Sequence, residues 1–186
     1  MACVPPSRWC RAGFPVDLKD EKMAGGWKVD DAARVRTLRE FGLLDSGAEK
    51  AFDQIAHAAA AICDAPIALV TLLDSDRQVF KAHHGTELTG TPIELALCRH
   101  VFEAGEAIII PDLTQDPRTR DNELVTGELA LRFYAGWPLV VDGHAFGTLC
   151  VIDMEPRPEG LAPHQERGLA ALAFEVKELM EQRRPA

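Results

Sequence analysis

Cysteine is scarce in this sequence of 186 residues, and its five copies are unevenly spaced. No two of them form the Cys-x-x-Cys spacing of a zinc ribbon or a dithiol motif, and their number is odd. This argues against a secreted domain held by disulfides, and we expect reduced thiols in a cytoplasmic protein. The histidines are dispersed as well, without the i, i+4 spacing of helical metal ligands, so no metal site is expected.

Long apolar runs are also missing, because none reaches the roughly 18 residues that a helix needs to cross a bilayer. Residues 1–20 are interrupted by Pro and Gly and do not resemble a signal peptide. The net charge of −9 argues against a nucleic-acid partner, since phosphate binding needs clustered Lys and Arg. We therefore expect no membrane and no nucleic acid among the partners.

One segment of domain size, residues 30–184, follows a tail at 1–28 that is rich in Pro, Gly and charge. Apolar residues at helical spacing predict several helices, which cover 31–41, 46–63, 93–105 and 164–182. In the second of these, Ser46 and Glu49 match a capping box.

Short apolar or alternating runs predict strands, which cover 67–74, 77–84, 106–112, 132–141 and 144–152. Residues 85–92 are expected to be loop, and 122–126 to form one helical turn. Asp142-Gly143 supplies the two positive φ angles of a type I′ hairpin turn. Because several connections are as short as hairpins, the order of elements predicts an α+β domain built on an antiparallel sheet.

Several strings, in this order and at this spacing, resemble the GAF domain family of small-molecule sensors. They are R-x-x-x-L-x-x-x-x-L-L-D (34–45), Phe52-Asp53, APIALVTLLD (65–74), RQVFKAHHG (77–85), C-x-H (98–100), IPDLTQDPR (110–118), RFYAGWPL (132–139), GTLCVID (147–153) and Q-x-x-x-L (165–169). The chain is most similar to GAF modules of bacterial histidine kinases and diguanylate cyclases.

The resemblance implies a six-stranded antiparallel sheet with the terminal helices and the second helix on one face. Short helices and loops from 93–130 would cover a pocket on the other face. The family accepts many ligands or none, so the ligand has to be argued from the site.

Cys98 lies on the predicted 93–105 helix, and His100 follows two residues later. In bilin-binding relatives a Cys near a His attaches the tetrapyrrole, but the accompanying motifs are missing here. A nearby Arg99 or His100 could lower the pKa of the Cys98 thiol and favour redox chemistry. Cys63, Cys98 and Cys150 fall on two helices and a strand, however, and do not resemble the clustered cysteines of free methionine-sulfoxide reductases. The alternative is a half-buried thiol that packs against the sheet.

The long loop after the third strand carries Asp112, Asp116 and Arg118. Its Asp side chains are typical of turns, where they cap backbone amides. As a lid over the pocket, the loop could instead hold an anionic ligand through Arg118 or Arg120.

Alternation along 132–137 places Arg132, Tyr134 and Gly136 on one face of a strand. A cation, a phenol and an open position together favour a pocket floor. The other interpretation is that Arg132 pairs with an Asp of the 112–121 loop, over Tyr134.

We therefore expect a non-catalytic sensory or regulatory module in signal transduction. It would bind an unidentified small molecule at Cys98, Asp112, Asp116, Arg118, Arg132 and Tyr134, with no cofactor that the sequence identifies. A homodimer through the 31–41 and 164–182 helices is expected, with a histidine kinase or a cyclase as a possible output partner. Two alternatives stay open: a thiol enzyme of the free methionine-sulfoxide reductase type, and a ligand-free dimerisation domain.

Overall fold

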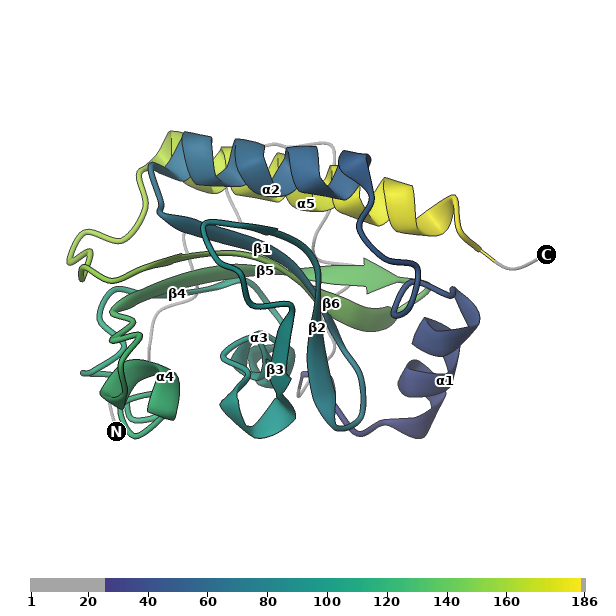
Figure 1. Cartoon of the computed structure of the whole chain (residues 1–186), viewed down its shortest axis with the longest axis horizontal. Helices are drawn as coiled ribbons and strands as arrows, with labels where there is room; N and C mark the ends of the chain where they lie inside the picture. The colour runs from purple at the N-terminus through teal and green to yellow at the C-terminus, as the bar shows by residue number, and fades with distance from the viewer. Residues whose placement is uncertain (1–25, 185–186) are drawn as a thin grey trace.

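A computed structural model describes residues 26–184 of the chain, in which helices pack on both faces of one antiparallel sheet (Figure 1). The strand order is β3-β2-β1-β6-β5-β4. The strands are β1 Ile67–Leu73, β2 Arg77–His84, β3 Gly90–Pro92, β4 Ile108–Ile110, β5 Phe133–Val141 and β6 His144–Asp153. The helices are α1 Ala32–Glu40, α2 Lys50–Cys63, α3 Arg99–Ala104, α4 Glu123–Thr126 and α5 Pro163–Glu181, with a 3₁₀ turn η2 at Ile93–Leu95.

The six-stranded antiparallel sheet confirms the expected α+β fold. At the β5–β6 hairpin, Asp142 and Gly143 have φ angles of 52° and 75°, which confirms the type I′ turn. The expected loop at 85–92 contains the short edge strand β3. In the part of the chain that the structure describes, no helix is both long enough and apolar enough to span a bilayer.

Helices α2 and α5 lie side by side on one face of the sheet (Figure 1). Their apolar stripes, with Phe52, Ile55, Leu169 and Val176 among them, pack against side chains of β1, β5 and β6. This packing buries an almost purely aliphatic and aromatic layer. It makes this face a scaffold, since buried apolar area is the main source of stability.

Helix α1 does not join that layer, contrary to the expectation for the terminal helices. It lies at one end of the sheet beside β6 (Figure 1). Asp31 caps it by accepting a bond from the Arg34 amide at 2.8 Å. The Arg34 side chain is buried and donates to the carbonyl oxygen of Leu73 at 2.6 Å and to that of Val29. These carbonyls attract the guanidinium inward, which anchors α1 at the end of β1.

The predicted capping box is a second correction. Helix α2 begins after Glu49, and Ser46 does not cap it. Both side chains instead bind the Lys81 ammonium, whose Nζ lies 2.5 Å from Ser46 Oγ and 2.6 Å from Glu49 Oε1. Lys81 is 2% exposed, and a buried cation must be paired, so it takes the groups that would otherwise cap the helix.

The predicted 93–105 helix is divided into η2 and α3, because Ala96 between them has extended backbone. Of the predicted tail, residues 1–25 lie outside the described residues. Trp27 belongs to the fold: its amide donates to the Phe102 carbonyl at 2.7 Å, and its ring packs edge-on against Phe102.

The two central strands approach each other very closely at Gly147 of β6. A Cβ atom placed there would lie 1.6 Å from the Thr71 carbonyl oxygen of β1. Only glycine fits against the neighbouring backbone, and Gly147 therefore permits the β1–β6 pairing on which the sheet is built.

We expect Gly147→Ala to lower the free energy of unfolding by about 3 kcal/mol or more, because the clash is with backbone and a central ladder must shift. Chemical denaturation measures this. Gly168→Ala on α5 is the matched control, because its Cβ would meet only the Ile62 side chain, at 2.8 Å. Equal stability of the two variants would contradict the argument.

Candidate functional site

The second face of the sheet is covered by short segments: η2, α3, α4 and the loops between β4 and β5 (Figure 1). A second core lies between these segments and the strands, with Leu69, Phe102, Leu113 and Ile152 among its apolar members. Polar side chains lie within this layer, and they include hydroxyl and thiol groups at its centre.

Five side chains at the middle of this layer form what we call the thiol–hydroxyl cluster: Thr71, Cys98, Tyr134, Thr148 and Cys150. The hydroxyls of Thr148, Tyr134 and Thr71 donate to Cys98 Sγ at 2.9, 3.3 and 3.5 Å. The sulfur atom of Cys150 lies 3.9 Å from that of Cys98. All five side chains are buried, so the cluster is closed to solvent.

Strand register assembles most of the cluster. Thr71 pairs directly with Thr148, and their hydroxyls lie 3.0 Å apart. Cys150 follows Thr148 on the same face of β6, and Tyr134 reaches this face from β5. Cys98 comes from the cover, as the N-cap residue of α3.

These contacts shift the pKa values of the two thiols in opposite directions. Burial alone would raise the pKa of Cys98, but hydrogen bonds from Cys150, Thr148, Thr71 and Tyr134 outweigh it and lower that pKa below the ordinary range of a thiol. The hydrogen bond to Cys98 and burial both raise the pKa of Cys150. Burial also raises the pKa of Tyr134 well above its usual value, which keeps the phenol a donor. In contrast, burial raises the pKa of Cys63 on α2 to about 11.

Four buried side-chain atoms of the described residues have no hydrogen-bond partner: Trp27 Nε1, Arg34 Nε, Gln78 Oε1 and Thr91 Oγ1. We call them the unpaired polar atoms, and all of them lie on the α3 side of the sheet. Trp27 belongs to the second core, and the Arg34 guanidinium lies 5.4 Å from the centre of the Phe102 ring. Gln78 is opposite Leu73, another member of that core, and Thr91 is opposite Gln78.

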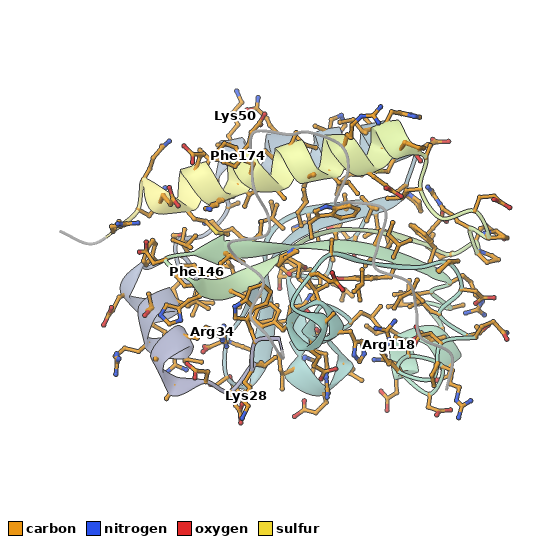
Figure 2. The ribbon with its side chains drawn as sticks, turned by 180° about the vertical axis from the view of Figure 1, so that it is seen from behind. Lys28, Arg34, Lys50, Arg118, Phe146 and Phe174 are labelled. Atoms are coloured by element: carbon orange, nitrogen blue, oxygen red, sulfur yellow. The ribbon has the colours of Figure 1, made fainter. Side chains whose placement is uncertain are left out.

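Figure 2 places Arg34 below the sheet between α1 and α3. Its buried side chain makes no ion pair among those found for residues 26–184, and burial lowers its pKa. The carboxylates of Asp74, Asp31 and Asp30 act in the opposite direction and favour the charged guanidinium. A buried cation therefore lies beside the Phe102 ring.

Of the six predicted ligand contacts, two lie in the thiol–hydroxyl cluster. Cys98 and Tyr134 meet in the cluster. The opening expected beside Gly136 is filled, because a Cβ atom at Gly136 would lie 2.3 Å from the Tyr134 hydroxyl oxygen. Gly136 thus accommodates the Tyr134 ring, which occupies the predicted pocket floor.

The other predicted contacts make local bonds. Asp112 accepts from the amide and hydroxyl of Thr114, at 2.9 and 2.7 Å. Arg118 donates to Asp116 at 2.6 Å in an exposed pair, and its side-chain hydrogen bond lowers the pKa of Asp116. Arg132 donates to the carbonyl oxygens of Val125 and Leu131, at 3.0 and 2.9 Å. Figure 2 shows Arg118 well away from Arg34.

Sequence reasoning missed Thr71, Thr148 and the position of Cys150. Assigning Cys98 and Cys150 to different elements suggested that they lie apart, which is wrong: a helix terminus packs directly on the strand. The available signal was a hydroxyl residue within each of two apolar runs, IALVTLL and TLCVI. In strands buried on both faces, such residues indicate a polar site.

A surface hollow lies outside the cluster, beside β3. It has a volume of about 560 Å³, and its lining includes Asp53, Lys81, Gln78 and Thr91. Across residues 26–184, no group of three or more His, Cys, Asp or Glu side chains is arranged to hold a metal ion.

We expect Thr148→Val to raise the pKa of Cys98, because it removes the shortest hydrogen bond to that sulfur and leaves burial to dominate. The ultraviolet absorbance of the thiolate, taken as the difference from Cys98→Ser, gives this pKa. The control is Thr119→Val in the same cover layer, because the Thr119 hydroxyl donates to the Leu113 carbonyl and not to sulfur. An unchanged titration in Thr148→Val would contradict the assignment.

Comparison with known proteins agrees with this architecture. The GAF domain family model matches residues 47–177. A cyclic di-GMP phosphodiesterase of Pseudomonas aeruginosa is 40% identical over 144 residues, which are 77% of this chain and 24% of that protein. The chain thus spans about a quarter of the length of this relative.

Two solved structures illustrate the shared fold. The free methionine-R-sulfoxide reductase of Neisseria meningitidis aligns over 82% of this chain and 91% of its own, with TM-score 0.58 and 18% identity. The GAF domain of an Acinetobacter phosphoenolpyruvate-protein phosphotransferase aligns over 81% and 94%, with TM-score 0.57 and 17% identity. At such identities the likeness concerns the fold alone. Because the family model covers most of the described domain and the sheet is that of its structural relatives, the chain belongs to the GAF domain family.

Proposed function

We propose that this chain is a regulatory input module of a signalling protein, which binds a small polar molecule on the α3 side of its sheet. The observation that carries the proposal is the position of the four unpaired polar atoms. All of them lie on this side, and each buried polar atom without a partner costs about 1–3 kcal/mol. A ligand that satisfies them would recover that free energy.

The donor or acceptor character of these four atoms determines which groups a ligand must present. Trp27 Nε1 and Arg34 Nε are donors, Gln78 Oε1 is an acceptor, and the Thr91 hydroxyl can act as either. A suitable molecule therefore presents both acceptors and donors, together with an apolar or aromatic part to pack near Phe102. The Arg34 cation favours a molecule with negative charge on the acceptor side.

The cover of this face suits ligand entry. Helix α3 has six residues and α4 has four, whereas α5 on the opposite face has 19. Short segments with few buried contacts open at lower free energy than a long packed helix. The hollow beside β3, whose lining includes Gln78 and Thr91, offers an approach from the sheet edge.

The regulatory role rests on the family and on the relative. That relative is a cyclic di-GMP phosphodiesterase, and the match covers only a quarter of it. We infer that this chain regulates an enzyme of cyclic di-GMP signalling or a histidine kinase, in the same polypeptide or as a separate partner. Its alternative as a thiol-dependent sulfoxide reductase gains support from the proximity of Cys98 and Cys150, but both thiols are closed to solvent.

We expect Gln78→Met to raise the free energy of unfolding of the ligand-free protein by about 1 kcal/mol, because it removes an unsatisfied buried carbonyl. The same change is expected to abolish retention of a small molecule that wild type carries through purification. Denaturation and native mass spectrometry measure the two effects.

The matched control is Gln115→Met, an exposed glutamine in the cover loop, which should change neither quantity. A wild type without any bound molecule, together with a destabilised Gln78→Met protein, would exclude a ligand role for these atoms.

We also propose that the module forms a homodimer through α5. Helix α1 lies apart from α5, so the two expected helices do not share one surface. Phe174 is 41% exposed on α5, outside the core (Figure 2). We place the contact at Phe174 because burying a large aromatic ring contributes more to an interface than burying most other side chains.

Phe174→Lys is accordingly expected to convert a dimer into a monomer in light scattering, because the charge cannot be buried in an apolar contact. Leu129→Lys is the control, since Leu129 is 45% exposed in the cover of the opposite face. A monomeric wild type, or a Phe174→Lys protein that remains dimeric, would refute the α5 interface.

A further inference from the structure

We propose that Cys98 and Cys150 are a redox site, in which a small hydroperoxide converts the two thiols into a disulfide and thereby displaces α3. The site goes beyond ligand binding, because it gives the same face of the sheet a covalent input. The geometry that points to it is a sulfur–sulfur distance of 3.9 Å between a helix terminus and a central strand. A disulfide requires about 2.0 Å, so the two atoms must approach by about 2 Å.

The packing of the two elements indicates which of the two cysteines moves. Cys150 belongs to β6, which is paired on one side with β1 and on the other with β5. Cys98 caps a helix of six residues, without a side-chain capping bond. Shifting β6 would break two ladders, whereas shifting α3 alters a few contacts of a short helix. Cys98 and α3 therefore move toward the sheet.

The surroundings give the two thiols different roles. Three hydroxyl groups donate toward Cys98 Sγ, which stabilises a thiolate there, while Cys150 keeps its proton. A thiolate is the form that attacks peroxide, and a neighbouring thiol is the group that resolves the product. Cys98 is the attacking sulfur and Cys150 the resolving one.

The reaction balances in two steps. The Cys98 thiol first gives up its proton, and the thiolate attacks the terminal oxygen of the hydroperoxide. The O–O bond breaks, the alkoxide or hydroxide takes up that proton and leaves as alcohol or water, and Cys98 becomes a sulfenic acid. Cys150 then attacks the Cys98 sulfur, the S–S bond forms, and the sulfenic oxygen leaves as water with the Cys150 proton. Two thiols and one hydroperoxide thus give one disulfide, one alcohol or water, and one water.

Oxidation would be transmitted through contacts that α3 already makes. A disulfide sulfur accepts hydrogen bonds poorly, so the hydroxyls of Thr148 and Tyr134 lose their acceptor. Phe102 moves with α3, and it contacts both Trp27 and the Arg34 guanidinium. The thiol pair is thereby linked to α1 and to two of the unpaired polar atoms.

Burial restricts the oxidant. Cys98 is 2% exposed and Cys150 is inaccessible, so only a molecule as small as hydrogen peroxide is expected to reach them, during brief openings of the cover. Cys63 is equally buried on the other face, has no neighbouring thiol among residues 26–184, and carries a raised pKa. It is the internal control for a buried but unreactive thiol.

The test uses the full chain with Cys3→Ser and Cys10→Ser, because these two cysteines lie outside the described residues. The protein is treated with hydrogen peroxide, unfolded, alkylated and measured as an intact mass. Two cysteines without alkyl groups and a mass two hydrogens below that of the corresponding free dithiol, with a linked Cys98–Cys150 peptide and recovery in dithiothreitol, support the proposal. Full alkylation of both thiols, or irreversible oxidation of Cys98 with Cys150 still free, overturns it.

Single variants sharpen the test. Cys63→Ser is expected to form the bridge as the parent does, whereas Cys98→Ser and Cys150→Ser form none. Amide exchange of residues 93–105 should differ between the reduced and bridged forms, while that of α2 should not. A bridge with unchanged exchange at 93–105 would refute the displacement of α3. No small-molecule ligand takes part, so failure here is distinguishable from failure of the ligand proposal.

Discussion

The structure depends on the close pairing of β1 and β6 at the centre of the sheet. Gly147 lies against the Thr71 carbonyl with no room for a side chain, and the same register places Thr71 opposite Thr148 and Leu69 opposite Cys150. A slip of one residue would turn the hydroxyl and thiol groups of β6 toward α2 and α5, away from the hydroxyl and thiol groups that they now contact. Backbone sterics at Gly147 therefore determine which side chains of β6 face α3.

The two faces of the sheet have different physical characters. One is covered by two long helices over an apolar core, while the other combines a buried thiol–hydroxyl cluster, a buried arginine bound to backbone carbonyls and several unpaired polar atoms under short segments. Apolar packing contributes stability without specificity for a ligand, whereas buried polar groups contribute specificity at a cost in stability. The sheet thus separates the stabilising α2–α5 layer from the polar layer under the short segments. Helix α3 contacts the thiol pair through Cys98 and the Arg34 cation through the Phe102 ring.

Much of the fold followed from local patterns. The positive φ angles at Asp142 and Gly143, the apolar stripes of α2 and α5 and the helical turn after Asn122 were all predicted and are present. The two wrong predictions, the capping box and the position of α1, share one cause. Ser46 and Glu49 form no cap because both side chains bind Lys81, which is 32 residues or more away along the chain. Helix α1 lies outside the expected layer because Arg34 binds carbonyl oxygens of distant strands. Long-range pairing of a buried charge outweighs a local capping preference.

For this protein, the sequence by itself determined the elements and the face on which each residue lies, since both follow from backbone periodicity and turn chemistry. It placed Tyr134 and Gly136 on one face correctly, but only the tertiary structure showed the Tyr134 ring lying over Gly136 and closing the predicted pocket floor. Likewise, only tertiary packing brought Cys98 to Cys150 across 52 residues of chain. Such contacts depend on how a helix docks on a sheet, which is set by the whole core and by no local pattern.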